Sequence, residues 1–133
     1  MKLDVVIARY NRSTLLRKTL GSLLNARVPA GLDVRIIAVD NNSTDDTKAV
    51  IQEMGDRVSY VFEKKQGRSP ALNAGVAVAT GDLVGFIDDD EEIDAAWYET
   101  ILAAFTEHDV DFIGGPYVPR FETDVPEWLP KSP

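Results

Sequence analysis

Five consecutive carboxylate side chains, at residues 88–92, are the part of the sequence best suited to chemistry. The sequence there reads DDDEE and follows directly on the apolar stretch LVGFI of residues 83–87, which is typical of a buried strand. Neighbouring carboxylates repel one another, so the arrangement costs stability unless a cation or a hydrogen-bond network offsets the repulsion. Two interpretations stay open: a divalent metal ion bound at a strand end, or a solvated acidic loop that caps the next helix.

The metal interpretation points to a particular class of substrate. Mg²⁺ and Mn²⁺ bind carboxylate oxygens and keep coordination positions open for phosphate oxygens. A metal ion at residues 88–90 would therefore suit a substrate with a diphosphate leaving group, because the ion neutralises the charge that develops as the group departs.

Asp40 is a second candidate, since it ends the apolar stretch of residues 33–39. In nucleotide-binding α/β folds, an acid at this place accepts a hydrogen bond from a ribose or a base. The alternative is a turn residue, helped by Asn41 and Asn42, which follow it in the sequence.

The usual glycine-rich motifs for phosphate binding, GxGxxG and GxxxxGK[ST], do not occur in the sequence. A phosphate group would have to be bound by a metal ion, a helix N-terminus or a basic side chain. Arg68 is such a side chain, because it lies just before Ser69, the predicted N-cap of a helix that begins at Pro70. Asn73 lies inside that helix, where its amide either has a buried structural partner, which we favour, or faces a ligand.

Apolar stretches alternate along the chain with segments of helical spacing. Strands are predicted at residues 3–8, 33–39, 58–62, 83–87 and 110–114. Predicted helices separate them, including one at residues 70–80, and the alternation implies an α/β fold of three layers, α/β/α, with a mostly parallel sheet. Right-handed crossovers place the carboxyl ends of all strands at one edge, so the polar segments 9–12, 40–46, 63–69 and 88–92 should meet there.

Composition excludes several classes of function. The chain has 133 residues, enough for one domain, and a net charge of −8, which argues against binding to nucleic acid or to an anionic membrane surface. It has no cysteine, which excludes disulfides and thiolate chemistry and fits a cytoplasmic location. No apolar run is long enough for a membrane span, and a peripheral position at the inner face of the membrane stays open.

The sequence divides into an α/β domain, residues 1–115, and a tail, residues 116–133, rich in proline and aromatic residues. The prolines prevent the tail from forming one regular element. It either docks as an extended segment through its aromatic side chains or leads into a second half of the protein.

Four motifs in this order and spacing, ARYNR, VDNNSTDDT, GRSPALNAG and FIDDDEE, resemble the N-terminal half of a family 2 glycosyltransferase of the GT-A fold. The resemblance runs from about Val5 to Trp128, and GGPYVPRFE and PEWL resemble the segment where the acceptor side begins in bacterial members. It implies inverting transfer of a sugar from a nucleotide-diphosphate sugar, often a UDP-sugar, to an acceptor hydroxyl, with Mn²⁺ or Mg²⁺. The acceptor would be a glycan or a lipid-linked molecule, in the synthesis of a polysaccharide or a cell-envelope glycan.

The resemblance also implies roles for individual residues. The nucleotide-sugar site would contain Ala8, Arg9, Tyr10, Asn11, Asp40, Asn42, Arg68, Asn73, Asp88 and Asp89. Tyr10 would stack on the base, Asp88 would lie by the ribose or sugar, and Asp90 would be the metal ligand of the DxD motif.

The family pattern also includes a further half, with an acidic base that deprotonates the acceptor hydroxyl. The sequence stops at Pro133, before such a base is expected, so we expect a truncated, nucleotide-binding half with little or no transfer of its own. A noncatalytic module of the same fold, which binds a nucleotide or a partner, is the alternative. A nucleotidyltransferase is disfavoured, because residues 9–12 contain no glycine. The unfinished sheet edge of a half-domain leaves homodimerisation open.

Overall fold

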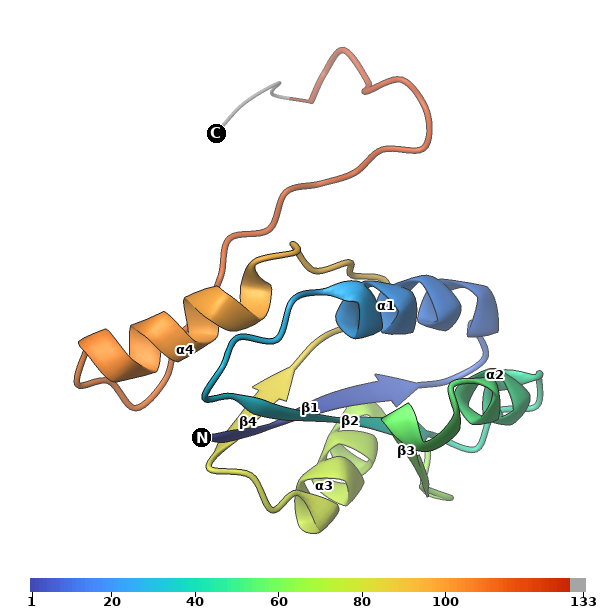
Figure 1. Ribbon diagram of the computed structural model, residues 1–133. Helices are drawn as coiled ribbons and strands as arrows, with labels where there is room; N and C mark the ends of the chain where they lie inside the picture. Colours follow the sequence, from blue (N-terminus) through green and yellow to red (C-terminus); the bar gives the residue numbers. More distant parts are fainter. Residues whose placement is uncertain (130–133) are drawn as a thin grey trace.

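Four parallel strands form the sheet of this protein, in the order β3-β2-β1-β4 (Figure 1). The computed structural model describes residues 1–129. In chain order the elements are β1 Lys2–Arg9, α1 Ser13–Asn25, β2 Asp33–Asp40, α2 Thr47–Glu53, η1 Gly55–Arg57, β3 Val58–Phe62, α3 Arg68–Val78, β4 Leu83–Phe86 and α4 Trp97–Glu107. The prediction of a parallel sheet with helices on both faces is confirmed.

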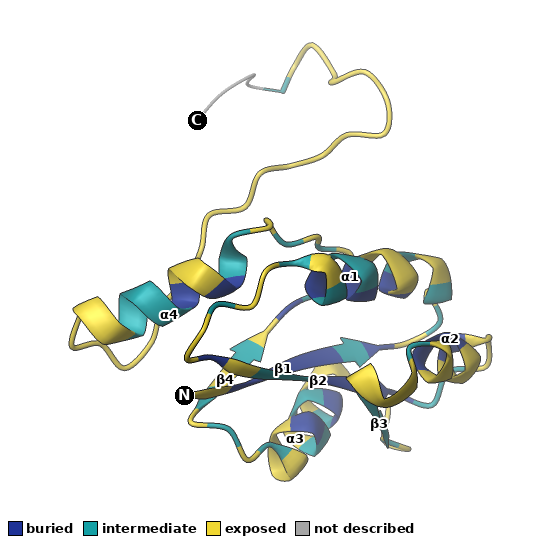
Figure 2. Ribbon diagram, viewed as in Figure 1, coloured by how far each residue is buried: buried dark blue, intermediate teal, exposed yellow. Residues whose placement is uncertain are grey.

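The two faces of β1 belong to two separate apolar clusters. Val5 and Ile7 lie in the larger cluster, to which α1, α2 and α4 contribute buried side chains. Val6 faces the other way and packs with Ala71 of α3. Because β1 is covered on both sides, its sequence is apolar almost throughout, and Figure 2 shows the central strands as the most buried part of the molecule.

The four strands bring their carboxyl ends to one edge of the sheet, as the topology predicts. β1 and β2 run in register from Lys2 opposite Asp33 to Arg9 opposite Asp40. β1 also pairs with β4, where Val6 lies opposite Phe86. The loops that follow these strands therefore start side by side, and this edge carries the candidate site.

The prediction of a strand at residues 110–114 is wrong. Those residues are in an irregular, exposed conformation, and the side chain of Phe112 is 86 % exposed. An apolar pattern predicts burial, but a strand forms only when another strand supplies hydrogen bonds, and this segment pairs with no strand of the described sheet. Residues 110–114 run instead into the tail.

The tail forms no helix or strand over residues 116–129, as its prolines predict, and Figure 2 shows it as almost entirely exposed. One ion pair, between Arg120 and Glu92, joins it to the loop after β4. Pro130 and Pro133, which were counted in the predicted tail, lie outside the described residues. Among residues 1–129, no helix is both long and apolar enough to cross a membrane.

Candidate functional site

A cavity of about 440 Å³ opens at the carboxyl edge of the sheet. Residues 8–10 and Arg12 line it from the end of β1, Asn41 from the end of β2, residues 66–68 from the start of α3, and residues 88–90 from the loop after β4. The predicted meeting of polar segments is therefore confirmed for these four regions. Three arginines and three aspartates border the same cavity.

The loop of residues 88–92, here called the acidic loop, is neutralised mainly by arginines. Arg68 forms an ion pair with Asp88, with 2.6 Å between Nη1 and Oδ1, and Arg9 forms one with Asp89. Within residues 1–129, no ion pair involves Asp90, which is exposed at the cavity. Asp88, whose ion pair uses Oδ1, is 45 % exposed at its side chain.

Arg9 is a buried cation at the end of β1. Its side chain is 0 % exposed, and none of its three guanidinium nitrogens has a hydrogen bond of ordinary geometry within the described residues. Burial lowers the pKa of Arg9 to about 10, and the like charge of Arg12 acts in the same direction. The carboxylates of Asp45 and Asp90 oppose this change in the pKa.

Asp40 is only 4 % exposed and is not among the residues that border the cavity. Its Oδ1 accepts a hydrogen bond from the backbone N–H of Ser43, and its Oδ2 accepts one from the hydroxyl of Tyr60, both at 2.9 Å. Burial raises the pKa of Tyr60 to about 12, and the hydrogen bond to Asp40 makes a smaller contribution in the same direction. The hydrogen bond from Ser43, three residues after Asp40, is that of the turn residue considered as the alternative. A contact between Asp40 and a nucleotide stays a prediction.

Asn41 was missed as a site residue, although it borders the cavity. Its Nδ2 donates hydrogen bonds to the carbonyl oxygens of Glu63 and Lys65, at 3.1 and 2.8 Å. Its Oδ1 accepts one from the N–H of Gly67, at 2.9 Å. Asn41 thus fixes the loop that presents Arg68, and its position directly after a strand end was the only signal for this in the sequence.

Asn11 joins the loops after β1 and β2. Its backbone has φ of 50°, its N–H donates to Ser43 Oγ at 3.1 Å, and its Oδ1 accepts from the N–H of Thr44 at 2.7 Å. Asp45 in the same loop accepts a hydrogen bond from the N–H of Ser13, at the start of α1. Burial alone would raise the pKa of Asp45, but the hydrogen bonds to this carboxylate hold it below its ordinary value.

The remaining predicted residues are more exposed. Tyr10 borders the cavity and is 47 % exposed, which leaves its ring accessible to a ligand. Asn42, with φ of 63°, lies in the turn after β2, beside the cavity-lining Asn41. Asn73 is exposed on α3 and does not border the cavity, so it is not the buried, partnered amide that the sequence favoured.

The sequence matches the family described as "Glycosyl transferase family 2" over residues 4–133. The chain belongs to glycosyl transferase family 2. One relative is the GalNAc(5)-diNAcBac-PP-undecaprenol beta-1,3-glucosyltransferase of Campylobacter jejuni, which is 37 % identical over 106 residues, covering 76 % of this chain and 33 % of the relative. The chain therefore spans about a third of the length of that family 2 protein.

Solved structures of glycosyltransferases have the same fold. The mannosyltransferase PcManGT from Pyrobaculum calidifontis, in complex with GDP-Man and Mn²⁺, superimposes with a TM-score of 0.69 at 24 % identity, over 84 % of this chain and 33 % of that chain. S. aureus TarS 1-349, in complex with UDP-GlcNAc, gives a TM-score of 0.68 at 24 % identity, over 88 % of this chain and 37 % of that chain. The predicted GT-A fold is confirmed.

The residues of this family 2 chain fit a metal ion that is shared with a substrate. No group of three His, Cys, Asp or Glu side chains within residues 1–129 is arranged to hold a metal ion by itself. Mg²⁺ in phosphate-binding sites is held by one or two carboxylates, with phosphate oxygens and water completing its coordination. The exposed Asp90, with Asp88 beside it, suits that arrangement.

The tail approaches the same site. The negative charge of Glu91 raises the pKa of Tyr117, and Asp88 acts in the same direction. The ion pair between Arg120 and Glu92 is the contact that joins the described tail to the acidic loop.

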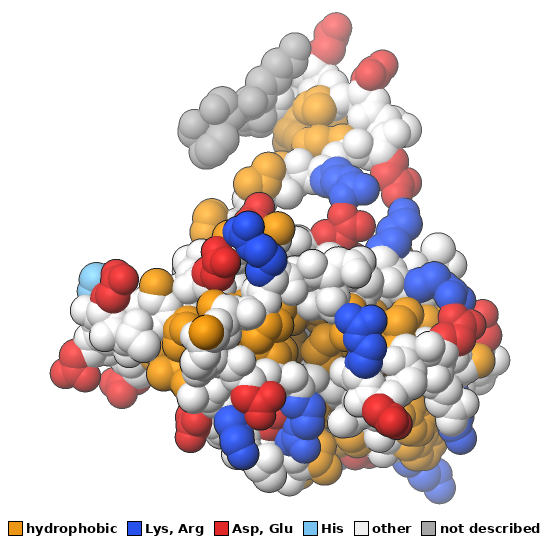
Figure 3. All heavy atoms as spheres, viewed as in Figure 1, with side chains coloured by type: hydrophobic (Ala, Val, Ile, Leu, Met, Phe, Trp, Pro, Cys, Tyr) orange, Lys and Arg blue, Asp and Glu red, His pale blue; other side chains and the backbone are white. Residues whose placement is uncertain are grey.

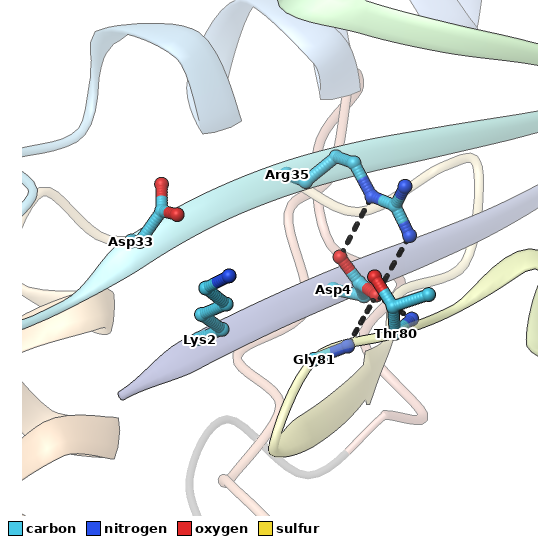
Figure 4. A pocket seen from close by; sticks show the side chains of 6 residues that line it. All are labelled: Lys2, Asp4, Asp33, Arg35, Thr80 and Gly81. Atoms are coloured by element: carbon cyan, nitrogen blue, oxygen red, sulfur yellow. Dashed lines mark hydrogen bonds and ion pairs between the residues drawn. The ribbon is translucent and has the colours of Figure 1, made fainter.

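A second, smaller cavity of about 160 Å³ lies at the opposite edge of the sheet, where the strands begin (Figure 4). Arg35 forms two hydrogen bonds of 2.9 Å with Asp4, and Asp4 Oδ2 also accepts from the N–H groups of Thr80 and Gly81. None of the predicted site residues lines this cavity, and Asp4, at its centre, is bound by Arg35 and by two backbone N–H groups. We assign it a structural role.

Proposed function

We propose that this chain is the donor-binding half of an inverting glycosyltransferase. It binds a nucleotide-diphosphate sugar, a UDP-sugar in our proposal, in the cavity at the carboxyl edge of the sheet, for transfer of the sugar to an acceptor hydroxyl. The observation that carries the proposal is that the three aspartates at residues 88–90 differ in their ion pairs. Arginines neutralise two of them, and the third faces the cavity free of an ion pair among the described residues.

In this proposal Asp90 binds Mn²⁺ or Mg²⁺, which supplies positive charge to the departing diphosphate. Asp88 lies where the ribose or the sugar would bind. Tyr10 has an accessible ring for stacking on the base, beside Ala8. Family membership supports these roles, and so does the complex of a protein of the same fold with GDP-Man and Mn²⁺.

The acceptor is proposed to be a glycan or a lipid-linked molecule in cell-envelope or polysaccharide synthesis. The name of the Campylobacter jejuni relative, which contains PP-undecaprenol, supports a lipid-linked acceptor. We further propose a cytoplasmic location, free or peripheral to the inner face of the membrane. The base that deprotonates the acceptor hydroxyl is expected in the half that follows the nucleotide-binding half in family 2 members.

A second copy of the chain is proposed as a partner, because β4 has a free edge. Within the described sheet β4 pairs only with β1, and Val84 and Phe86 on β4 are exposed. Unpaired apolar edge strands tend to pair with other chains. Sedimentation equilibrium should therefore detect a dimer that weakens on Phe86→Lys. A monomer at every concentration would remove the homodimer from the proposal.

Calorimetric titration of UDP and of GDP into the chain, with Mn²⁺ and with EDTA, tests the donor site. We expect UDP to bind only with the metal ion, and more tightly than GDP. Asp90→Ala should abolish this metal-dependent binding. Asp109→Ala is the matched control, because Asp109 is an exposed acid after α4, outside the residues that line the cavity.

The alternative function is a noncatalytic module of the same fold that binds a nucleotide or a partner, and only its partner-binding form predicts that neither nucleotide binds. If neither nucleotide binds the wild type, the chain is not a donor-binding half by itself. If Asp90→Ala binds UDP with the same Mn²⁺ dependence as the wild type, Asp90 is not the metal ligand.

A further inference from the structure

The ion pair between Arg9 and Asp89 is the only one among the described residues whose basic side chain is fully buried. The Arg9 side chain is 0 % exposed and that of Asp89 is 22 % exposed, whereas Arg68 and Arg120, which also pair with the acidic loop, are mostly exposed. Burying a guanidinium group costs free energy unless a carboxylate compensates it. The carboxylate of Asp89 therefore compensates the buried charge of Arg9, and without it the guanidinium group would be buried and unpaired.

Asp89 is also held through its backbone. The hydroxyl of Thr19, a buried residue of α1, donates a 3.0 Å hydrogen bond to the carbonyl oxygen of Asp89. One residue earlier, the backbone N–H of Asp88 donates to Glu91 Oε2 at 3.1 Å. All three aspartates line the cavity, but only Asp89 is also held by side chains of β1 and α1, through Arg9 and Thr19.

We infer that Arg9 is a positioning residue that acts through Asp89. It holds the middle of the acidic loop against the end of β1, so that Asp90 faces the cavity at the place where the metal ion of the proposed function would bind. The inference rests on that proposed function for the metal ion, but the pairing of Arg9 with Asp89 is testable without any ligand.

A direct contact between Arg9 and the nucleotide is the competing role, because Arg9 is among the residues that line the cavity. Its side chain is 0 % exposed and all three guanidinium nitrogens are buried, so a direct contact would require the side chain to move. Arg68, which is two-thirds exposed at the same cavity, is better placed for a direct contact.

A double-mutant cycle with Arg9→Met, Asp89→Asn and the combined variant tests the inference. Thermal unfolding, hydrogen exchange of residues 87–91, and the affinity for UDP with Mn²⁺ and with EDTA are measured on all four proteins. Arg17→Met with Glu53→Gln is the matched control cycle, because Arg17 and Glu53 form an exposed ion pair between α1 and α2.

Both single variants should unfold at lower temperature, Asp89→Asn by roughly 10 °C and Arg9→Met by less, because Asp89→Asn leaves the more deeply buried charge unpaired. Hydrogen exchange of residues 87–91 should accelerate in both. In the folded Arg9→Met protein, the gain in UDP affinity that Mn²⁺ provides should fall about 10- to 100-fold, as is typical when a supporting residue of a metal ligand is lost. The combined variant should recover most of the stability, the slow exchange and the metal-dependent gain.

Three results would overturn the inference. Additive effects of the two substitutions on stability and exchange would show that Arg9 does not act through Asp89. A loss of UDP affinity in EDTA that the combined variant does not recover would show a direct nucleotide contact. A normal Mn²⁺-dependent gain in the folded Arg9→Met protein would show that Arg9 has only a structural role. If the wild type does not bind UDP, the proposed function fails, while the stability and exchange measurements still decide the pairing.

Discussion

The hydroxyl of Tyr60, on β3, donates a 2.9 Å hydrogen bond to Oδ2 of Asp40, at the end of β2. The other carboxylate oxygen of Asp40 is bound by the N–H of Ser43, so both oxygens have partners inside the protein. A nucleotide that binds to Asp40 must therefore share or replace one of these hydrogen bonds. This relationship makes Tyr60 a means of testing what Asp40 does.

Tyr60→Phe should destabilise the protein by about 1–3 kcal/mol, because it leaves an oxygen of a buried carboxylate without its hydrogen bond. Urea unfolding monitored by circular dichroism measures this change. Tyr10→Phe is the control, since the Tyr10 side chain is half exposed and should lose almost nothing. An unchanged unfolding midpoint in Tyr60→Phe would show that the hydrogen bond to Asp40 contributes no stability. If Asp40 binds the nucleotide, Tyr60→Phe should also change the affinity for UDP, whereas a purely structural Asp40 predicts no change in the folded protein.

Asn41→Ala should loosen the loop that leads to Arg68, because it removes three hydrogen bonds to residues 63–67. We expect a loss of stability of about 2–3 kcal/mol and faster hydrogen exchange at Gly67. Affinity for UDP should fall as well, since Arg68 would no longer be held at the cavity. Asn42→Gly is the control, because glycine adopts the φ of 63° at this position without strain and the one side-chain hydrogen bond of Asn42 within the described residues is long, at 3.5 Å. Equal exchange rates in the two variants would contradict the role given to Asn41.

Asp4→Asn should reduce both the stability of the protein and its sensitivity to acid (Figure 4). Burial alone would raise the pKa of Asp4, but hydrogen bonds from Arg35 and from the backbone of Thr80 and Gly81 hold it below its ordinary value of 3.8. Because the folded-state pKa is the lower one, the stability that Asp4 contributes is complete above pH 3.8 and is lost as the pH falls through the folded-state pKa. The wild type should therefore be more stable than Asp4→Asn near pH 6, with the difference shrinking below about pH 4.

Thermal unfolding of both proteins across this pH range measures the effect. Asp33→Asn is a suitable control, because Asp33 lines the same small cavity but lies on the exposed first residue of β2. A stability difference between the wild type and Asp4→Asn that stays constant down to pH 2 would contradict the assigned pKa direction. Figure 3 shows acidic and basic side chains intermixed over the viewed face, so general charge repulsion should affect both variants alike.

The four strands of the sheet are predictable from the sequence to within one residue at each end, because their signal is local. Strands covered on both faces have continuous apolar sequences, and β1 and β2 are of this kind. The segment 110–114 has a similar pattern but forms no strand, since pairing depends on a partner that the local sequence does not reveal. The edge that carries the cavity follows from the parallel topology, so it could also be predicted.

The roles of individual site residues were less predictable, because they depend on contacts between distant parts of the chain. The burial of Arg9 under the acidic loop joins residues that are 80 positions apart, and no spacing rule indicates it. Asn41 appears in the sequence as an ordinary turn residue, although its side chain fixes a loop more than 20 residues away. Family resemblance pointed to the region of the candidate site, but only the fold separates side chains that border the cavity from those that support it.

Gly75→Ala should destabilise the protein, although alanine usually stabilises a helix. A Cβ atom at Gly75 would lie 2.4 Å from Val6 Cγ1 and 3.1 Å from Val39 Cγ2, so α3 would have to move away from the sheet. Overpacking of this kind costs about 1–3 kcal/mol, which outweighs the gain of about 1 kcal/mol from replacing glycine within a helix. Gly21→Ala, in α1, is the matched control, because nothing lies within 4 Å of its added Cβ and it should be stabilising. Chemical unfolding of the two variants should therefore give opposite signs, and a stabilised Gly75→Ala would mean that α3 does not pack against β1 as closely as described.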